Sequence, residues 1–147
     1  MRLATEKANS VAQSEPGALV LGSDQVAVAH GELLEKPGSE ANARGQLARL
    51  SSTTAHFYTA CVLACSGSNL HASHLDTTRV VFRALTLAEI ERYVARERPL
   101  DCAGSFKAEA LGISLLREID SRDPTALIGL PLIWVAAALR TAGYLLP

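Results

Sequence analysis

The chain has 147 residues, of which 48% are hydrophobic and 20% charged, enough for one compact domain with its own core and short for two. Fourteen Lys and Arg face fifteen Asp and Glu, a formal charge of -1, so no overall basic field indicates a nucleic-acid polymer as partner. The longest uncharged apolar run, residues 127–139, is shorter than the roughly 20 residues that span a bilayer, and charges interrupt residues 1–7 where a signal peptide would be apolar. We therefore expect a single domain over residues 1–147 that is cytoplasmic and binds neither membranes nor nucleic-acid polymers.

The cysteines and histidines show no spacing typical of a metal site or a disulfide framework. Cys61, Cys65 and Cys102 form an odd set without a CxxC pair, which is typical of reduced thiols. The four histidines are scattered, and we expect them at surface or loop positions.

The first part of the chain predicts helices around one strand. An alanine-rich segment favours a helix over residues 3–13, which Pro16-Gly17 ends before a strand at residues 18–28. Ser39 is suited to cap a second helix that continues to Leu50.

The middle of the chain predicts a pair of strands and a third helix. Residues 54–65 and 74–82 are rich in Thr, Val, Tyr and Phe around the polar loop 66–69, which is typical of an antiparallel pair. Thr86 and Glu89 form a capping-box pattern that starts a helix.

The remaining segments complete a mixed α/β pattern. Pro99 limits the third helix, residues 113–119 predict another strand, and Pro131 suits the start of a final apolar helix to about Leu139. The fold class is therefore α/β, with a mixed, twisted β-sheet and flanking helices.

The strand at residues 18–28 contains one acid, Asp24. Side chains alternate along a strand, so Asp24 shares a face with small and apolar residues. These residues are Val20, Gly22, Val26 and Val28. An ionised carboxylate among such neighbours costs several kcal/mol or more unless a cation, a metal or several donors compensate it. A site that uses the charge is one explanation, and a turn at residues 22–24 between two strands is the other.

A second segment with chemical content is residues 102–113, where small residues surround Phe106, Lys107 and Glu109. Glycines allow a ligand to approach the backbone closely, but they also occur in ordinary turns whose charged residues face water. Lys7 and Lys36 are open to the same two interpretations, because most lysines are solvated.

The order and spacing of these motifs are more specific than any one of them. In chain order they are Glu6-Lys7-Ala8, Gly22-Ser23-Asp24-Gln25, Lys36-Pro37, Phe57-Tyr58-Thr59, Cys102-Ala103-Gly104-Ser105-Phe106-Lys107 and Gly129-Leu130-Pro131. This order resembles the Maf family of nucleoside triphosphate pyrophosphatases from Leu3 almost to the end of the chain, and implies a Maf/ITPase-like fold. Glu109 after the Gly104 motif, together with Gln25, is similar to the branch that hydrolyses 7-methyl-GTP, whereas the dTTP and UTP branch has a glutamine near the position of Glu109.

The resemblance implies hydrolysis between the α and β phosphates, giving a nucleoside monophosphate and pyrophosphate with help from Mg²⁺ or Mn²⁺. Asp24 would act as general base on the attacking water or hold that water through the metal. Lys7, Lys36 and Lys107 would bind the phosphates, whose charge the metal neutralises only in part.

The resemblance also implies which residues select the substrate. The Watson-Crick edge of guanine offers N1-H and the N2 amino group side by side, and the carboxylate of Glu109 could accept both. Methylation at N7 adds positive charge, which favours a carboxylate over an amide. Gln25, which directly follows the expected general base Asp24, contributes to the choice of substrate in the family.

The chain departs from the family pattern at three places. It starts after the strand and the Ser- and Arg-containing phosphate loop with which members begin, so we expect a truncated domain and self-association, such as a homodimer, that covers exposed strand edges. Glu35 and Ser52 stand where many members carry Gly. Two alternatives to 7-methyl-GTP hydrolysis remain open, namely UTP or dTTP pyrophosphatase activity and a catalytically silent scaffold that binds nucleotides.

Overall fold

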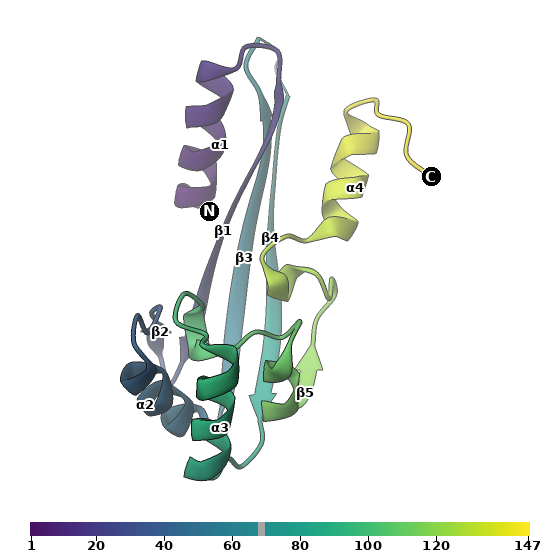
Figure 1. Cartoon of the computed structure of the whole chain (residues 1–147). Helices are drawn as coiled ribbons and strands as arrows, with labels where there is room; N and C mark the ends of the chain where they lie inside the picture. The colour runs from purple at the N-terminus through teal and green to yellow at the C-terminus, as the bar shows by residue number, and fades with distance from the viewer. Residues whose placement is uncertain (68–69) are drawn as a thin grey trace. The chain divides into compact units, whose positions relative to one another are not determined.

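The computed structural model describes residues 1–67 and 70–147 and shows a five-stranded sheet with strand order β2-β1-β3-β4-β5, together with α-helices and 3₁₀-helices (Figure 1). In chain order the elements are α1 (Arg2–Ser14), β1 (Leu19–Ala29), β2 (Glu32–Leu34), α2 (Glu40–Leu50), β3 (Thr54–Cys65), β4 (His71–Phe82), α3 (Leu87–Glu97), η1 (Ala103–Ser105), η2 (Leu111–Leu115), β5 (Leu116–Asp120), η3 (Ala126–Ile128) and α4 (Leu132–Thr141). The α/β class is confirmed. The predicted loop at 66–69 lies partly outside the described residues.

The helix N-caps predicted at Ser39 and Thr86 are confirmed. The hydroxyl of Ser39 accepts a hydrogen bond from the Asn42 backbone N–H at 3.2 Å and starts α2. At α3, the Glu89 N–H donates to the Thr86 hydroxyl at 3.3 Å, while the Thr86 N–H donates to the Glu89 carboxylate at 2.8 Å. The capping box is therefore confirmed. The helix α3 ends at Glu97, and its C-cap Arg98 has a φ of 46° before Pro99.

The strand predicted at residues 113–119 is wrong in its first half. Residues Leu111–Leu115 form the 3₁₀-helix η2, and the strand β5 begins only at Leu116. The Ser114 hydroxyl donates to the Leu111 carbonyl at 2.7 Å, which closes this turn locally. The segment therefore forms a turn before it enters the sheet at Leu116.

Two further boundaries differ from the prediction. β4 begins at His71 rather than at residue 74. The strand β2 was not predicted. His30 and Gly31, at φ 54° and 77°, form a tight turn, after which only three residues pair with β1.

The chain forms two compact units, each built from separate segments. Unit 1 contains residues 1–25, 58–77 and 122–147, and unit 2 contains residues 26–57 and 78–121. The strands β1, β3 and β4 contribute residues to both units. The prediction of a single domain over residues 1–147 therefore stays a prediction.

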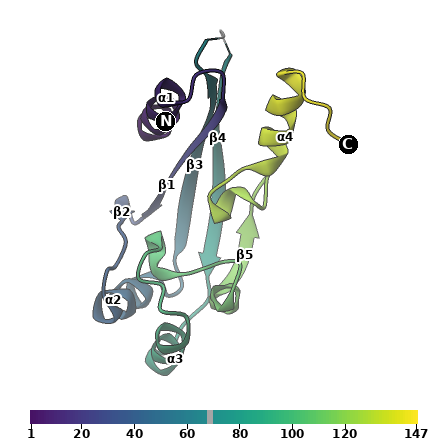
Figure 2. The same ribbon diagram turned by 45° about the horizontal axis from the view of Figure 1, so that its top comes forward.

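In unit 1, α1 and α4 lie on opposite sides of the strands β1, β3 and β4 (Figures 1 and 2). The helix α1 contributes buried alanines to a small core, whose members are Ala4, Ala8, Ala60, Val62 and Ala64, with Val20 packed against them. Because the β3 members are two residues apart, they lie on one face of the strand. The first α-helix is therefore fixed to the sheet by small side chains that allow close approach.

In unit 2, α2 packs against α3 and against η1. Phe106 packs edge-to-face against Phe57 and Phe82, with ring centroids 5.5 Å and 5.3 Å apart. Ser52, at one of the family's glycine positions, has a φ of 59°, which explains why glycine suits this turn.

Within the described residues, no helix has the length and apolar character needed to cross a bilayer.

Candidate functional site

Asp24 is paired with a lysine. The Lys7 ammonium on α1 lies 2.6 Å from Asp24 Oδ1 and donates to the Ser23 carbonyl at 3.2 Å. The strand β1 runs without interruption from Leu19 to Ala29, so the alternative of a turn at residues 22–24 is wrong. The expectation of apolar surroundings holds only in part, because the Asp24 side chain keeps 20% of its exposure and Val26 keeps 39%.

Gly22 explains how α1 can bring Lys7 so near to the strand. A Cβ atom at Gly22 would lie 2.5 Å from the carbonyl oxygen of Ala4, a distance that real side chains do not adopt. Ala4 and Ala8 are fully buried at this contact. The glycine and the alanines together therefore set the distance between Lys7 and Asp24.

The residues on either side of Asp24 lie on the opposite face of β1 and are hydrogen-bonded to the turn at residues 126–129. Ser23 Oγ lies 2.6 Å from the carbonyl oxygen of Gly129. The Gln25 amide nitrogen lies 2.9 Å from the Thr59 hydroxyl, and it reaches two carbonyl oxygens of the turn at 3.0 Å and 3.1 Å. The amide nitrogen of Gln25, a residue predicted to select the substrate, is thus engaged within the protein.

Asp123 holds the same turn in place. Its carboxylate, on a residue that is 4% exposed, accepts from the Thr125 N–H at 3.0 Å and from the Ile133 N–H at 2.7 Å. Burial raises the pKa of this carboxyl, but the hydrogen bonds from Thr125, Ile133 and Trp134 outweigh burial and leave the pKa below its usual value. Asp123 is therefore ionised at neutral pH and acts as a structural acceptor.

Lys36 belongs to unit 2 and lies in the segment between β2 and α2. Two side chains of α2 hold its neighbours, because Asn42 donates to the Pro37 carbonyl at 2.9 Å and Gln46 donates to the Glu35 carbonyl at 3.1 Å. The backbone on both sides of Lys36 is thus fixed, while its side chain is exposed.

Gln46 also reaches the second lysine-bearing loop. Its side-chain oxygen accepts from the Ser105 hydroxyl at 2.5 Å, and Ser105 is fully buried with a φ of 56°. The segment of Lys36 and the loop of Lys107 are therefore connected through one glutamine side chain.

The backbone of Lys107 is enclosed on two sides. Its N–H donates to the Tyr93 hydroxyl at 3.0 Å, and a Cβ at Gly112 would lie 2.4 Å from its carbonyl oxygen. Burial raises the pKa of Tyr93, so the phenol stays protonated at neutral pH. Only Gly at position 112 allows η2 to pack this closely against Lys107.

Two of the predicted lysines help to lower the pKa of the same carboxyl group, that of Asp101. The pKa of Asp101 is lowered by its own backbone N–H and by the Cys102 thiol, and further by the positive charges of Lys107 and Lys36. Both charges therefore lie within electrostatic reach of Asp101. Glu109 is exposed and has no hydrogen-bond or ion-pair partner within residues 1–67 and 70–147.

The six predicted residues thus divide between the two units. Lys7, Asp24 and Gln25 belong to unit 1, and Lys36, Lys107 and Glu109 belong to unit 2. Their roles remain predictions. Supporting roles were not predicted for Gly22, Thr59, Gln46, Tyr93 and Asp123, although Gly22 and Thr59 stand in the quoted motifs. The partners of Thr59 and Tyr93 lie far along the chain, whereas Asp123 bonds to the nearby Thr125 and Ile133.

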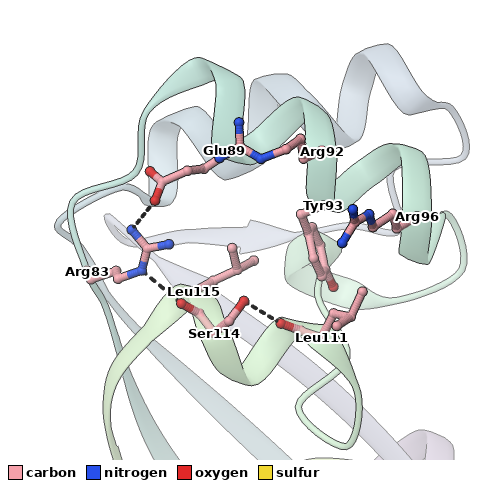
Figure 3. Close-up of a pocket in the computed structure, with 8 residues that line it drawn as sticks. All are labelled: Arg83, Glu89, Arg92, Tyr93, Arg96, Leu111, Ser114 and Leu115. Atoms are coloured by element: carbon pink, nitrogen blue, oxygen red, sulfur yellow. Dashed lines mark hydrogen bonds and ion pairs between the residues drawn. The ribbon is translucent and has the colours of Figure 1, made fainter.

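A hollow of about 190 Å³ in unit 2 contains none of the predicted residues among its described lining residues (Figure 3). Three arginines, Arg83, Arg92 and Arg96, line it. Arg83 is held by Glu89 at 2.9 Å and by the Ser114 carbonyl at 2.8 Å.

The described residues contain no group of three or more His, Cys, Asp or Glu side chains that could hold a metal ion. His30 and His71 are exposed, and His56 and His74 lie half-buried in β3 and β4. Burial raises the pKa of the Cys61 and Cys102 thiols to about 11 in each case, so neither is a thiolate at neutral pH.

Comparison with known proteins agrees with the motif order. Residues 1–142 match the family described as Maf-like protein. The chain is 58% identical over 146 residues to the 7-methyl-GTP pyrophosphatase of Xanthomonas oryzae pv. oryzae, covering 99% of this chain and 76% of the relative. It is 53% identical over 146 residues to the 7-methyl-GTP pyrophosphatase of Aromatoleum aromaticum, covering 99% of this chain and 75% of the relative. The chain therefore belongs to the Maf family.

Proposed function

We propose that this protein hydrolyses 7-methyl-GTP to 7-methyl-GMP and pyrophosphate. The observation that carries the proposal is the pair of Asp24 and Lys7, 2.6 Å apart, on a strand and a helix whose contact leaves no room for a side chain at Gly22. The relatives named 7-methyl-GTP pyrophosphatase, 53–58% identical to this chain, support the choice of substrate.

In the proposed reaction Asp24 accepts a proton from water as the water oxygen bonds to phosphorus. The phosphoanhydride bond between the α and β phosphates breaks, and pyrophosphate leaves with the electron pair of that bond. Lys7 is bound to Asp24 in the structure, and a triphosphate offers its ammonium group a second anionic partner. The ammonium group then stabilises phosphate charge while the carboxylate becomes available to water.

Lys36 and Lys107 supply further positive charge for phosphate oxygens, as the resemblance implies. Asp24 Oδ1 faces Lys7, and within the described residues no hydrogen bond or ion pair occupies Oδ2. One carboxylate oxygen fits Mg²⁺ or Mn²⁺, because Mg²⁺ binds through one or two carboxylates together with phosphate oxygens and water. When bound, the metal neutralises phosphate charge that the lysines do not reach.

Glu109 is proposed to read the guanine edge. Its exposed carboxylate has no partner within the described parts of the chain, so its lone pairs are available to N1-H and the N2 amino group. A uracil or thymine edge offers a single donor between two acceptors, and its carbonyl groups would repel a carboxylate. This chemistry favours 7-methyl-GTP over UTP and dTTP.

The decisive experiment measures pyrophosphate release from 7-methyl-GTP, GTP, UTP and dTTP with Mg²⁺ or Mn²⁺. Wild type is expected to prefer 7-methyl-GTP, and Asp24→Asn is expected to lose about 10²–10⁴-fold in rate. Asp120→Asn, which removes an exposed carboxylate of β5, serves as the matched control and should retain activity.

Three other results would point elsewhere. Preference for UTP or dTTP would transfer the proposal to the other branch, while a folded wild type without turnover would support the silent scaffold. Activity unchanged by EDTA would remove the metal from the mechanism.

Size-exclusion chromatography with light scattering tests the proposed homodimer, and fractionation of the cells that produce the protein tests its proposed cytoplasmic location.

A further inference from the structure

The hollow of unit 2 has more positive than negative charge among its described lining residues (Figure 3). Three of these residues are arginines and one is an acid, Glu89. Arg92 and Arg96 lie four positions apart on α3 and therefore on one face of that helix. Arg83 directly follows β4 and reaches the hollow from a different segment. Positive charge in excess thus gathers around a space of about 190 Å³.

The one acid of the hollow is already paired. Glu89 Oε1 lies 2.9 Å from Arg83 Nη1, and Glu89 Oε2 accepts two hydrogen bonds from Thr86 at 2.8 Å each. Arg83 also donates from Nε to the Ser114 carbonyl at 2.8 Å. Within the described residues, Nη2 of Arg83 has no hydrogen-bond partner. Glu89 is therefore engaged by its own neighbours, and one nitrogen of Arg83 is left over.

Arg92 and Arg96 are exposed and have no hydrogen-bond or ion-pair partner within residues 1–67 and 70–147. Like charges four positions apart on a helix repel each other. Each arginine has an acid beside it in the sequence, Glu91 and Glu97, but adjacent residues of a helix do not face each other. Glu97 instead accepts a hydrogen bond from the Leu111 N–H at 3.1 Å. The described chain therefore supplies no partner for these two guanidinium groups.

A buried donor also lines the hollow. Tyr93 is 5% exposed, and its hydroxyl oxygen accepts a hydrogen bond from the Lys107 N–H at 3.0 Å. Burial raises the pKa of Tyr93, so the phenol keeps its hydrogen at neutral pH. That hydrogen has no acceptor in the described parts of the chain, although buried polar groups are normally paired. The Tyr93 hydroxyl is therefore available as a donor to a ligand.

Size and chemistry indicate what the hollow can hold. Its volume of about 190 Å³ is below the roughly 300–1,000 Å³ of pockets for drug-sized ligands. It is large compared with the roughly 30 Å³ that one water molecule takes up in the liquid. A guanidinium group presents its N–H donors in a planar fork that matches phosphate oxygens. These features favour a small anion over a whole nucleotide.

We propose that the hollow is a binding site for a phosphate group, as inorganic phosphate or pyrophosphate, held by Arg92 and Arg96 with the Tyr93 hydroxyl as a further donor. The site contains none of the residues assigned to the hydrolysis of 7-methyl-GTP, and the proposal does not depend on that activity. Because the Tyr93 hydroxyl also accepts from the Lys107 N–H, an anion bound there changes the surroundings of the Lys107 amide.

The test titrates the isotope-labelled full chain with inorganic phosphate and, separately, with pyrophosphate. Backbone amide signals in NMR spectra and calorimetry give the Kd for each anion. We expect the Lys107 and Leu111 amide signals to shift with the Kd that calorimetry measures. Arg92→Gln combined with Arg96→Gln should raise that Kd about tenfold or more, and Tyr93→Phe about threefold, because charge-assisted hydrogen bonds are the stronger ones.

Two other arginines provide the matched control. Arg117 and Arg122 are exposed, have no partner in the described residues and do not belong to the described lining of the hollow. Arg117→Gln combined with Arg122→Gln removes the same amount of charge and should leave the Kd near the wild-type value. An equal rise of the Kd in both double variants would show a general charge effect and overturn the proposal.

The lysines proposed to bind substrate phosphates are a second place where these anions could bind. Lys7→Met combined with Lys36→Met removes that charge and should leave the anion-induced shift of the Leu111 amide unchanged. A Kd that rises in this lysine variant but not in the arginine variant would place the anion at the proposed active site and overturn the inference.

The two anions distinguish the sources of the phosphate group. Pyrophosphate that binds at least tenfold more tightly than inorganic phosphate, with the difference lost in the arginine variant, would support a site for the product of the proposed reaction. Similar affinities, both weakened in that variant, would support a site for free phosphate. Absence of binding by either anion at millimolar concentration would overturn the proposal.

The outcome is separable from that of the proposed function. A wild type without turnover whose phosphate affinity depends on Arg92 and Arg96 would contradict the proposed function alone. An active enzyme whose phosphate affinity is the same with and without these arginines would contradict the anion site alone. Urea unfolding of each variant checks that it is folded under the conditions of the titration.

Discussion

Ala8 of α1 and Gly22 of β1 are in direct contact. A Cβ at Gly22 would lie 2.7 Å from the Ala8 amide nitrogen and 2.8 Å from the Ala8 Cβ. Both residues are buried; Ala8 directly follows Lys7, and Gly22 lies two positions before Asp24. The helix and the strand can therefore bring these two charged groups together only while position 22 carries no side chain.

Substitution of Gly22 by Ala should force α1 away from β1. We expect a loss of about 1–3 kcal/mol in the free energy of unfolding, the usual cost of overpacking, and a fall in activity because Lys7 moves with the helix. Urea unfolding and pyrophosphate release measure the two effects. Gly45→Ala in α2, where a Cβ meets nothing within 4 Å, should instead stabilise by about 0.5–1 kcal/mol; equal behaviour of the two variants would contradict the contact.

Removal of the Lys7 charge should affect activity far more than stability. The pair with Asp24 is partly exposed, with side-chain exposures of 56% and 20%, and such ion pairs contribute about 0–1 kcal/mol. Lys7→Met should therefore unfold near the wild-type urea concentration but lose on the order of 10²-fold in kcat. Arg2→Met on the same helix provides the control, and a similar loss in that variant would indicate a general charge effect.

Gln46 should control how well the triphosphate binds, because its two ends hold the segments that carry Lys36 and Lys107. Gln46→Leu removes both hydrogen bonds, whereas Gln46→Glu keeps an acceptor for the Ser105 hydroxyl and loses the donor to the Glu35 carbonyl. We expect KM to rise in both variants and more in Gln46→Leu, with stability lowered by about 1 kcal/mol per lost bond. Steady-state kinetics and urea unfolding provide the comparison, and an unchanged KM in Gln46→Leu would show that the two segments are held independently.

The capping box of α3 should make stability depend on pH in the acid range. Hydrogen bonds from the Thr86 backbone and hydroxyl, followed by contact with Arg83, lower the pKa of Glu89 from 4.5 to about 2. Because the folded pKa is depressed, this contribution is fully present above about pH 4.5 and is lost as the pH falls toward 2.

The check is urea unfolding of wild type and Glu89→Gln across that range. The difference in unfolding free energy between wild type and Glu89→Gln should be constant near neutral pH and should shrink as the pH falls from about 4.5 toward 2. Glu91→Gln, an exposed acid of the same helix, should track the wild type throughout. A difference for Glu89→Gln that grows on acidification would mean that the sign is wrong.

Local signals accounted for much of the fold. Ser39 and the pair Thr86 and Glu89 start their helices as predicted, because caps depend on residues a few positions apart. The prediction failed at residues 113–115, where a 3₁₀ turn forms against the backbone of Lys107. That packing depends on Gly112 meeting a loop that folds back upon it, and no local propensity describes it.

The candidate site shows the same division between the sequence and the tertiary structure. The family and the expected chemistry followed from the order of four motifs, because motif order and spacing are properties of the sequence alone. These motifs contain Lys7, Asp24, Lys36 and Lys107. Only the tertiary structure decided that Lys7 pairs with Asp24 and that the Gln25 amide turns inward. The physical reason is that hydrogen bonds and close packing join residues up to 106 positions apart, and their energies depend on distances that only the folded chain defines.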